Sequence, residues 1–394
     1  MSLSCLEEDR PTRAEVSLEA LERNLAAVRQ RCGGLPVMGV VKADAYGHGA
    51  LPVARTLVAA GIERLAVALL EEAVELRRGG LTIPLLVMGA LEPAQMDRAV
   101  REAITPALFR EDQLPALDQA ASLHGRPQPF HLKVDTGMGR LGAPWDDLDP
   151  LLDALARCPR LILEGVFSHL ACADEPDHPL TPLQLERFGQ VLGRIEERGL
   201  SPPLRHLANS AAVLDRPPAW LTLVRPGLLL YGYRPSSRNR DLPVTPVLKL
   251  SSRIVSVKTV RAGESVGYGG TFVARRKSRI AAVAAGYEDG VIRSLSNRGH
   301  FLVRGRRVPI VGRISMDLTT LDATDHPAAA VGDEAVLIGG QDGIFQGADE
   351  VGSEAGTISW EILCGIGWRV PRLYLRGGRV VDIRSRFVPD GGPG

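Results

Sequence analysis

Lys42 has the sequence setting of a reactive amine. It stands at the end of an apolar run in the stretch GVVKADAYGHGA, residues 39–50. Because lysine is rarely buried without a partner, a strand that ends on Lys42 brings an amine to the rim of a core. Cations beside such an amine favour its neutral form, which is the nucleophile. A lone lysine at a strand end is more often a surface cation, so its neighbours decide between the two interpretations.

Further polar side chains follow the ends of later apolar runs. They are Tyr46, Lys133, Asp135, Arg140, His169, Asn209, Ser210 and Arg225. In a barrel of alternating strands and helices, such residues meet at the face where the strands end, which is where active sites lie. Each one alone has a plainer interpretation as half of an ion pair, an edge residue or a hydrogen-bonded core residue. Only their joint placement favours an active site.

The loops after the last two runs have the residues of a phosphate site. Ser210 stands at a predicted helix start, and Gly227 lets the backbone approach a ligand closely. Barrels of this kind commonly bind phosphate in these two loops. A phosphate site beside a lysine suggests a phosphorylated cofactor joined to that lysine as a Schiff base, and pyridoxal 5'-phosphate is the obvious compound.

The elements that must position these residues are short apolar runs that alternate with segments of helical period. The runs are 36–43, 64–70, 84–90, 105–110, 130–137, 163–170, 204–209 and 221–227. Such continuous runs predict a parallel sheet covered on both faces. Their number favours a closed (β/α)₈ barrel, of the TIM type, over an open doubly wound sheet. Ser17 is the predicted N-cap of the first helix.

The second part of the chain has a different pattern. After about residue 243, short strands separated by glycine-containing turns replace the alternation, which predicts a mostly β domain. We expect a tail over 1–11, the barrel over 12–243, the β domain over 244–387 and a second tail over 388–394. The turn-rich stretch 233–243 is the predicted linker.

Composition and charge exclude several classes of protein. The chain has 394 residues with a formal net charge of +1, so no overall field favours nucleic acid, and the basic run 274–279 is expected to be a solvated turn. The five cysteines are scattered without a CxxC pair, which indicates reduced thiols and no metal site. Neither a signal peptide nor a membrane-spanning run is expected. We therefore predict a cytoplasmic protein.

The chain closely resembles the alanine racemases, which are pyridoxal-phosphate enzymes of fold type III. The resemblance runs from about Arg13 to Tyr374. It rests on VVKADAYGHG, HLKVDTGMGRLG, FSHLACAD, HLANSAA, VRPGLLLYG, ESVGYGGTF, GYEDG and GRISMDLTT. It implies an isomerase that interconverts L- and D-alanine and so supplies D-alanine, a peptidoglycan precursor.

The resemblance also implies roles for individual residues. Lys42 would hold the cofactor and serve the D face of the substrate, and Tyr268 from the second subunit of a homodimer would serve the L face. The cofactor contacts would come from Lys42, Tyr46, Arg140, His169, Asn209, Ser210, Arg225, Gly227, Leu228 and Trp360. The substrate carboxylate would meet Arg140 and the backbone of Met316, with Lys133, Tyr287 and Asp317 in support. Many members carry the lysine that matches Lys133 as a carbamate.

These roles fit the chemistry of racemisation. Inverting a stereocentre needs proton removal on one face and delivery on the other, which two bases do better than one. Arg225 would contact the pyridine nitrogen and keep its own proton, which should limit side reactions such as transamination. His169 would link Tyr268 to Arg225.

The chain departs from the family pattern at two positions. Trp360 stands where tyrosine is usual, and Ser315 stands where cysteine is common. A racemase of another or a broader range of amino acids is therefore one alternative, and another enzyme of fold type III, such as a decarboxylase, is a second. A non-catalytic carrier of the cofactor is a third, against which the β domain with Tyr268 argues.

Overall fold

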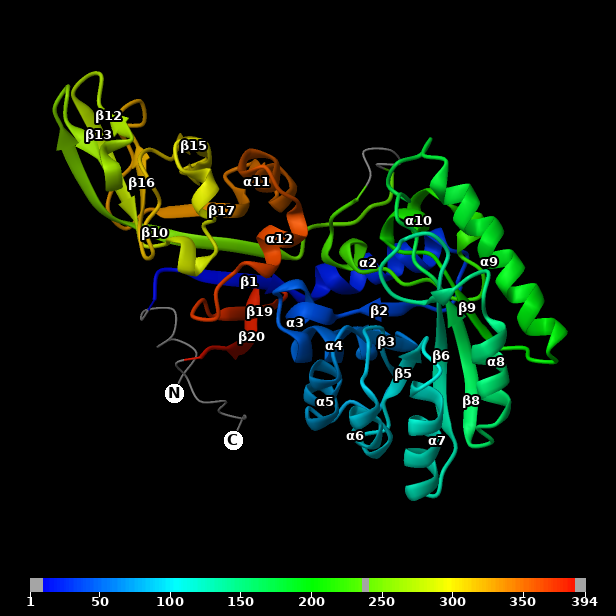
Figure 1. The fold of residues 1–394 in the computed structure, drawn as a ribbon. Coiled ribbons are helices and arrows are strands. Elements are labelled where there is room, and N and C mark those ends of the chain that lie inside the picture. Colours follow the sequence, from blue (N-terminus) through cyan, green and yellow to red (C-terminus); the bar gives the residue numbers. More distant parts are fainter. Residues whose placement is uncertain (1–9, 236–240, 387–394) are drawn as a thin grey trace. The chain divides into compact units, whose positions relative to one another are not determined.

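The computed structural model describes residues 10–235 and 241–386, which form two compact units (Figure 1). Among these residues, one unit takes 10–20, 46–49 and 246–386, and the other takes 21–45 and 50–245 apart from the gap. The predicted domain boundaries stay a prediction. The predicted tails fall almost entirely outside the described residues, as does the centre of the predicted linker.

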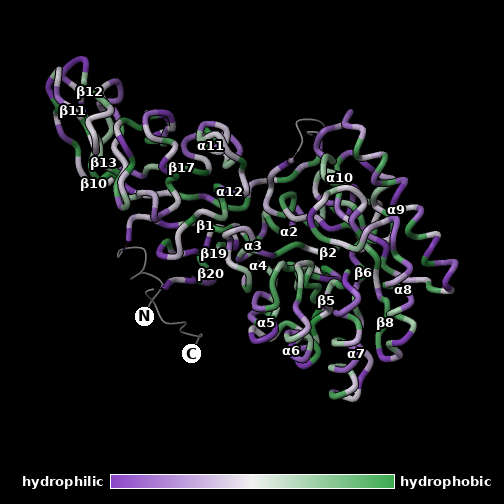
Figure 2. The backbone as a smooth tube through the Cα atoms, in the orientation of Figure 1, coloured by the Kyte–Doolittle hydropathy of each residue, from purple (hydrophilic) through white to green (hydrophobic). Residues whose placement is uncertain are grey.

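The second of these units is built on a parallel sheet. Its strands follow one another in the order β2 (Met38–Val40), β3 (Arg64–Val67), β4 (Leu85–Val87), β5 (Thr105–Leu108), β6 (Gln128–Asp135), β8 (Leu161–Phe167) and β9 (Leu204–His206), and the short β7 (Ala143–Pro144) pairs with β6. All residues of β2, β4 and β5 are buried, as near-continuous apolar runs require. Figure 2 shows hydrophobic stretches along the strands.

The eighth predicted strand closes this sheet without forming a regular strand. Val224 makes a parallel bridge to Val37, and the amide of Met38 donates to the carbonyl of Val224 at 2.9 Å. On the other side, the amide of Arg225 donates to the carbonyl of Ala208 at 2.9 Å. Pro226 has no N–H to extend a ladder, so the run contributes a bridge and not a strand.

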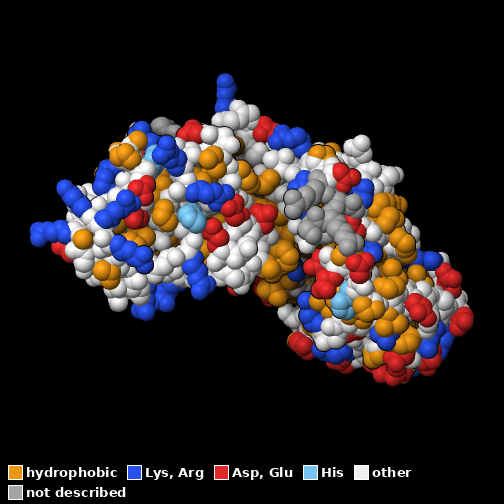
Figure 3. Space-filling model, turned by 90° about the horizontal axis from the view of Figure 1, so that it is seen from above, with side chains coloured by type: hydrophobic (Ala, Val, Ile, Leu, Met, Phe, Trp, Pro, Cys, Tyr) orange, Lys and Arg blue, Asp and Glu red, His pale blue; other side chains and the backbone are white. Residues whose placement is uncertain are grey.

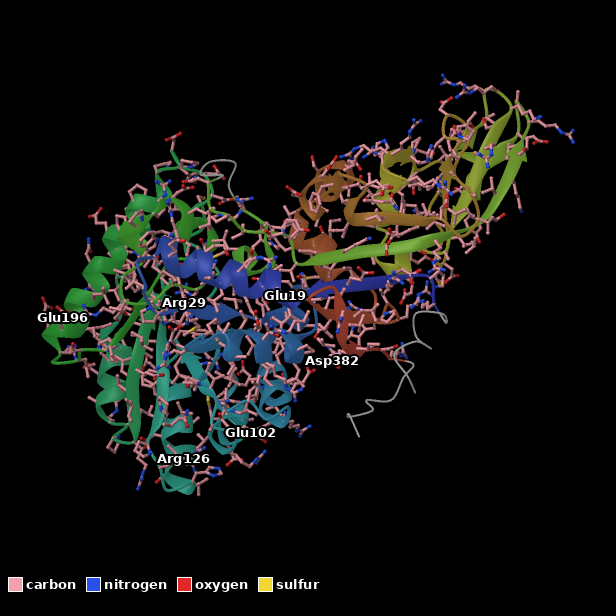
Figure 4. The ribbon with its side chains drawn as sticks, turned by 180° about the vertical axis from the view of Figure 1, so that it is seen from behind. Glu19, Arg29, Glu102, Arg126, Glu196 and Asp382 are labelled. Atoms are coloured by element: carbon pink, nitrogen blue, oxygen red, sulfur yellow. The ribbon has the colours of Figure 1, made fainter. Side chains whose placement is uncertain are left out.

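Helices cover the outside of these strands (Figure 1). They are α4 (Ala50–Ala59), α5 (Leu70–Arg78), α6 (Met96–Arg101), α7 (Gln113–Leu123), α8 (Asp149–Ala156), α9 (Leu180–Glu197) and α10 (Ser210–Asp215), together with most of α2 (Leu18–Arg31). Ser17 caps α2 as predicted, because its Oγ accepts from the amide of Ala20 at 3.2 Å. Arg29 and Arg126, labelled in Figure 4, donate to backbone carbonyls at the ends of α4 and α6.

The other unit is built on a mostly antiparallel sheet. Its main path is β15 (Arg306–Pro309), β14 (His300–Val303), β17 (Glu334–Gln341), β10 (Leu248–Val260), β1 (Arg13–Ser17), β19 (Arg372–Arg376) and β20 (Arg379–Arg384). The remaining elements are β11 (Ser265–Val266), β12 (Phe272–Val273), β13 (Ser278–Val283), β16 (Thr319–Asp322), β18 (Ile344–Gln346), α11 (Ala348–Ala355) and α12 (Ser359–Cys364). Because β1 pairs with β10 and β19, residues 13–17 lie in this sheet although the predicted barrel segment begins at residue 12.

Figure 3 shows hydrophobic and charged side chains mixed over much of the face that it draws. In the basic run, Arg275, Arg276 and Lys277 are exposed on the turn before β13. Within the described part of the chain, we find no helix with the length and apolar character that a bilayer crossing requires.

Candidate active site

Lys42 lies directly before an unusual turn of backbone. It begins the segment α3 (Lys42–Tyr46), in which Ala43, Asp44 and Ala45 have φ of 53° and Tyr46 has φ of 54°. This left-handed conformation costs an L-residue roughly 1–2 kcal/mol, so four in succession cost about 4–8 kcal/mol. Such strain persists only where surrounding contacts hold it, and it is typical of functional sites.

Two carboxylates hold this turn in the barrel unit. Oε1 of Glu72 accepts from the amide of Ala43 at 2.6 Å, and Oδ1 of Asp44 accepts from the amide of Ala50 at 2.7 Å. Glu72 also accepts from the amides of Ala68 and Leu69, at 2.8 and 3.0 Å. Sequence analysis missed Glu72, and the only local signal was its place at the third position of α5, where a carboxylate can reach back to the helix start.

Positive charge gathers around His169. Burial, and then the charges of four nearby cations, lowers the pKa of its imidazole to about 3; the cations are Arg225, Arg140, Lys42 and Lys133. His169 is therefore neutral at physiological pH. The structure brings these five predicted site residues together at the ends of the strands, as predicted from the barrel. A cluster of four cations with a neutral imidazole favours anionic groups such as phosphate and carboxylate.

Lys133 is the most buried amine of this cluster. Its Nζ donates to the carbonyl of Met88 at 2.9 Å and lies 5.4 Å from the centre of the Phe167 ring. Burial, followed by the charges of Arg140, Arg225 and Lys42, lowers the pKa of Lys133 to about 8. Roughly a tenth of this amine is therefore unprotonated at pH 7.

Asp135 shapes the loop that carries Arg140. Its carboxylate accepts from the amides of Gly137 and Met138 at 2.8 Å and from the amide of Arg140 at 3.1 Å. The loop passes back close to Asp135 at position 142. Glycine is needed there, because φ is 138° and a Cβ would lie 2.4 Å from the amide nitrogen of Asp135. The side chain of Arg140 is exposed.

Ser210 and Gly227, the two residues predicted to bind phosphate, lie in contact. Oγ of the buried Ser210 accepts from the amide of Gly227 at 3.0 Å and from the amide of Leu229 at 3.3 Å, with Leu228 between them. Asn209 caps α10 through Oδ1, which accepts from the amide of Ala212 at 3.1 Å. Two backbone N–H groups and a hydroxyl that meet at one point are the kinds of group from which phosphate sites are built.

Arg225 is buried and held by several acceptors. Its Nη2 donates to the carbonyls of Ser168 and Leu207 at 2.7 and 3.3 Å, and its Nη1 lies 2.7 Å from Nδ1 of His206. Burial lowers its pKa to about 9. The structure pairs Arg225 with His206, which sequence analysis quoted in HLANSAA but did not single out. The predicted link from Arg225 through His169 to Tyr268 stays a prediction.

The other predicted residues belong to the β unit. Tyr268 begins the 3₁₀ turn Tyr268–Gly270, and 72% of its surface is exposed. Tyr287 and Met316 are also exposed. Tyr46 is half-buried, and burial raises the pKa of its phenol. Trp360 lies on α12 and is half-buried.

Arg369 fixes the backbone around Met316. Its Nη2 donates to the carbonyl of Met316 at 3.0 Å, and its Nη1 lies 2.7 Å from Oδ1 of Asp317. The buried carboxylate of Asp289 accepts from Nε and Nη2 of Arg369 at 2.8 and 2.9 Å. Sequence analysis missed Arg369 because a single arginine after a helix carries no local signal, whereas Asp289 stood inside the quoted motif GYEDG.

Sequence comparison agrees with this architecture. Residues 16–235 match the family model described as alanine racemase, N-terminal domain, and residues 247–374 match the one described as alanine racemase, C-terminal domain. The chain belongs to the alanine racemase family. A curated alanine racemase from Sorangium cellulosum (strain So ce56) is 46% identical over 376 residues, which is 93% of this chain and 99% of that protein.

Solved alanine racemases have the same fold. The enzyme from Bacillus anthracis, solved with bound L-Ala-P, has a TM-score of 0.89 at 36% identity and covers 95% of this chain and 98% of its own. The enzyme from Bartonella henselae, solved with covalently bound pyridoxal phosphate, has a TM-score of 0.85 at 30% identity and covers 93% of this chain and 99% of its own. The predicted (β/α)₈ barrel followed by a mostly β domain is confirmed.

Membership in the alanine racemase family makes this chain a pyridoxal-phosphate-dependent isomerase of alanine. The residues of the barrel fit that cofactor. Lys42 supplies an amine at the strand ends, the amides of Gly227 and Leu229 meet the hydroxyl of Ser210 at one point, and four cations can balance the anionic charge. The predictions of activity and cofactor are therefore confirmed.

Proposed function

We propose that Lys42 and Tyr268 are the two bases that exchange the α-proton of alanine, one on each face of the substrate. The cluster of Lys42, Lys133, Arg140 and Arg225 around the neutral His169 carries this proposal. When bound, pyridoxal phosphate supplies the electron-withdrawing ring that makes the α-proton acidic. The side chains and backbone of this protein bind the cofactor and the substrate and transfer the protons.

Binding is divided among three sets of groups. The proposed phosphate contacts are Ser210, Gly227 and Leu228, through hydroxyl and backbone donors, together with Tyr46, Asn209 and Trp360. Arg140 and the backbone of Met316 hold the substrate carboxylate, so that a planar carboxylate meets a guanidinium. Arg225 holds the ring nitrogen and keeps its own proton at neutral pH, because its pKa, although lowered by burial to about 9, still lies above neutrality.

The proton transfers fall to the two proposed bases. The amine of Lys42 takes or returns the proton on the D face, and the phenol of Tyr268 does so on the L face. The left-handed turn after Lys42 restricts where that amine can point, and restricting a catalytic group lowers the entropy cost of the transfer.

We also propose that the active unit is a homodimer in the cytoplasm. The exposure of Tyr268, at 72% within one chain, supports a role for this phenol on a second copy of the protein. Cys32, Cys158 and Cys172 are free thiols, as suits a reducing compartment.

Lys133 is proposed to carry a carbamate. Its pKa of about 8 leaves enough neutral amine to react with carbon dioxide, and the product is an anion beside Arg140. The negative charge would hold the guanidinium of Arg140 toward the substrate carboxylate. Mass spectrometry of the native protein, with and without bicarbonate, tests this step.

Mixing two inactive variants tests the shared site. Lys42→Ala and Tyr268→Phe homodimers should each be inactive, and a mixture allowed to exchange subunits should recover about a quarter of the activity, since half the dimers then hold one complete site. D-alanine formation from L-alanine is the measurement. Recovery of no activity, from variants that fold and exchange subunits, would contradict the shared site, and full activity of either variant would contradict the two bases.

A further inference from the structure

A row of polar side chains extends from Arg225 through the interior of the barrel unit. Nη1 of Arg225 lies 2.7 Å from Nδ1 of His206, and Nε2 of His206 lies 2.8 Å from Nδ1 of His131. Nε2 of His131 lies 3.2 Å from Oε2 of Glu164. Oε1 of Glu164 accepts from Nη2 of Arg64 at 2.7 Å, which ends the row.

The direction of every hydrogen bond in this row follows from its first member. A guanidinium can only donate, so Nδ1 of His206 accepts and Nε2 of His206 carries the proton. That proton is donated to Nδ1 of His131, which leaves Nε2–H of His131 to donate to Glu164. Both imidazoles are therefore neutral and in the same tautomer, and neither can take a further proton without losing a bond of the row.

Burial and charge agree with this assignment. His131 and His206 are fully buried, and burial is the main cause that lowers the pKa of each. Burial acts to raise the pKa of Glu164, but hydrogen bonds from His131 and Arg64 overcome it and lower the pKa to about 2. Glu164 is thus a carboxylate that faces Arg225 through two neutral rings.

The strands that carry the row are adapted to it. The register between β6 and β8 shifts so that Phe130 faces Leu163 and His131 faces Gly165, which leaves Glu164 as the extra residue of a β-bulge. Bulges of this kind redirect a side chain beside active sites. Position 165 must be glycine for the row to form, because a Cβ there would lie 2.6 Å from Nδ1 of His131.

The ring of Phe167 packs against both His206 and Arg225. It stacks on His206 with 4.9 Å between centroids and 4° between planes. The guanidinium carbon of Arg225 lies 5.2 Å from the centre of the same ring. Phe167 therefore keeps the imidazole and the guanidinium in fixed orientations against one surface.

We propose that Glu164, His131 and His206 are positioning residues that hold Arg225 as a fixed, fully charged donor for the ring nitrogen of the cofactor. The carboxylate of Glu164 accepts the last proton of the row, so it favours the same tautomers that Arg225 requires, and it compensates the buried charge of Arg225 through the two imidazoles. The proposal rests on the proposed role of Arg225. It gives functions to a bulge, a glycine and two histidines that serve no other part of the proposed mechanism.

The tautomers are tested first, in the cofactor-free protein. Nitrogen-15 NMR of the imidazoles should show His131 and His206 neutral near pH 7, each with Nε2 protonated and Nδ1 unprotonated. Single His206→Asn and His131→Asn variants assign the signals. A protonated ring, or an Nδ1–H tautomer at either histidine, would overturn the proposal whatever the activity of the enzyme.

Two variants then test the effect on Arg225. Gly165→Ala pushes the ring of His131 without removing any polar group, and Glu164→Gln removes the charge at a side chain that is only 80% buried and so tolerates change. We expect kcat to fall about 10–100-fold, the loss typical of a hydrogen bond to a charged group, with KM for alanine within about twofold. The absorption band of the bound cofactor should also shift, because the guanidinium of Arg225 is then displaced relative to the ring nitrogen.

Matched controls separate this effect from general damage. Gly189→Ala adds a Cβ in open space on α9, and Glu196→Gln changes a surface carboxylate of the same helix, labelled in Figure 4. Both should leave kcat and the absorption band unchanged. Folded Gly165→Ala and Glu164→Gln enzymes with the kcat and absorption of the parent would refute the positioning role. If the proposed roles of Lys42 and Tyr268 as bases are wrong, the Lys42→Ala or Tyr268→Phe enzyme will instead keep full activity.

Discussion

Replacing Glu72 by glutamine should loosen the turn that presents Lys42. The carboxylate accepts from three amides, and the amide of Ala43 is the nearest at 2.6 Å. Glutamine keeps one acceptor oxygen and turns the other into a donor that faces an N–H. At least one hydrogen bond to a charged group is lost, which costs about 1.5–3 kcal/mol.

The consequence for Lys42 follows from the strain in the turn. Each left-handed residue after Lys42 relaxes by roughly 1–2 kcal/mol if it leaves that conformation, so the loss at Glu72 is comparable with the strain of one or two residues. We therefore expect the turn to open locally and the amine of Lys42 to lose its fixed direction. Both kcat and the affinity for pyridoxal phosphate should fall about tenfold or more.

Glu71→Gln is the matched control, because Glu71 is the preceding residue of α5 and lies on the surface. Its side chain is 59% exposed and lies 3.7 Å from Arg98, so its loss should change stability by no more than about 0.5 kcal/mol. The assays are the denaturant midpoint of the cofactor-free protein, cofactor titration and D-alanine formation. Equal midpoints for the two variants would refute the stability argument, and unchanged kcat in a destabilised Glu72→Gln enzyme would refute the link to Lys42.

Two further substitutions and one substrate comparison have outcomes that we can predict. Arg369→Lys should raise KM for alanine about tenfold with a smaller change in kcat, since lysine cannot hold Met316, Asp317 and Asp289 together; steady-state kinetics with unchanged KM would contradict this. Lys133 titrates near pH 8 when folded and near 10.5 when unfolded, so the unfolded chain binds more protons between these values and stability rises with pH there. In carbon-dioxide-free buffer, Lys133→Met should reduce the rise of stability with pH, measured from denaturant midpoints. If the midpoints of the variant rise with pH as steeply as those of the parent, another group is responsible for the rise. With Trp360 in place of the usual tyrosine, alanine should still be the best substrate in a panel of L-amino acids. Faster turnover of lysine or arginine than of alanine would contradict this prediction.

The repeating pattern of the sequence predicted the barrel well because strand and helix periodicity is local. Seven of the eight apolar runs contain regular strands of the parallel sheet. The eighth run closes the sheet through the bridge at Val224 and single hydrogen bonds at Arg225 and Pro226, without a regular strand, because Pro226 cannot donate to a ladder. The rule that active sites lie at strand ends then located Lys42, Lys133, Arg140, His169 and Arg225 from the sequence alone.

The contacts that hold those residues depended on which strands became neighbours. Glu72 meets Ala43 across 29 positions of sequence, and His131 meets His206 across 75. Neither pairing has a local signal, since a hydrogen bond between distant residues depends on which strands become neighbours and with what register. The bulge at Glu164 is the clearest case, because a shift of one residue decides where a carboxylate points.

The sequence by itself therefore determined the order of strands and helices, the change to a β domain and the types of group at the strand ends. Tertiary structure alone decided the left-handed turn after Lys42, which contains no glycine and which local preferences oppose. It also decided the charge states around Arg225, because burial and neighbouring charges set them and neither is a property of the local sequence.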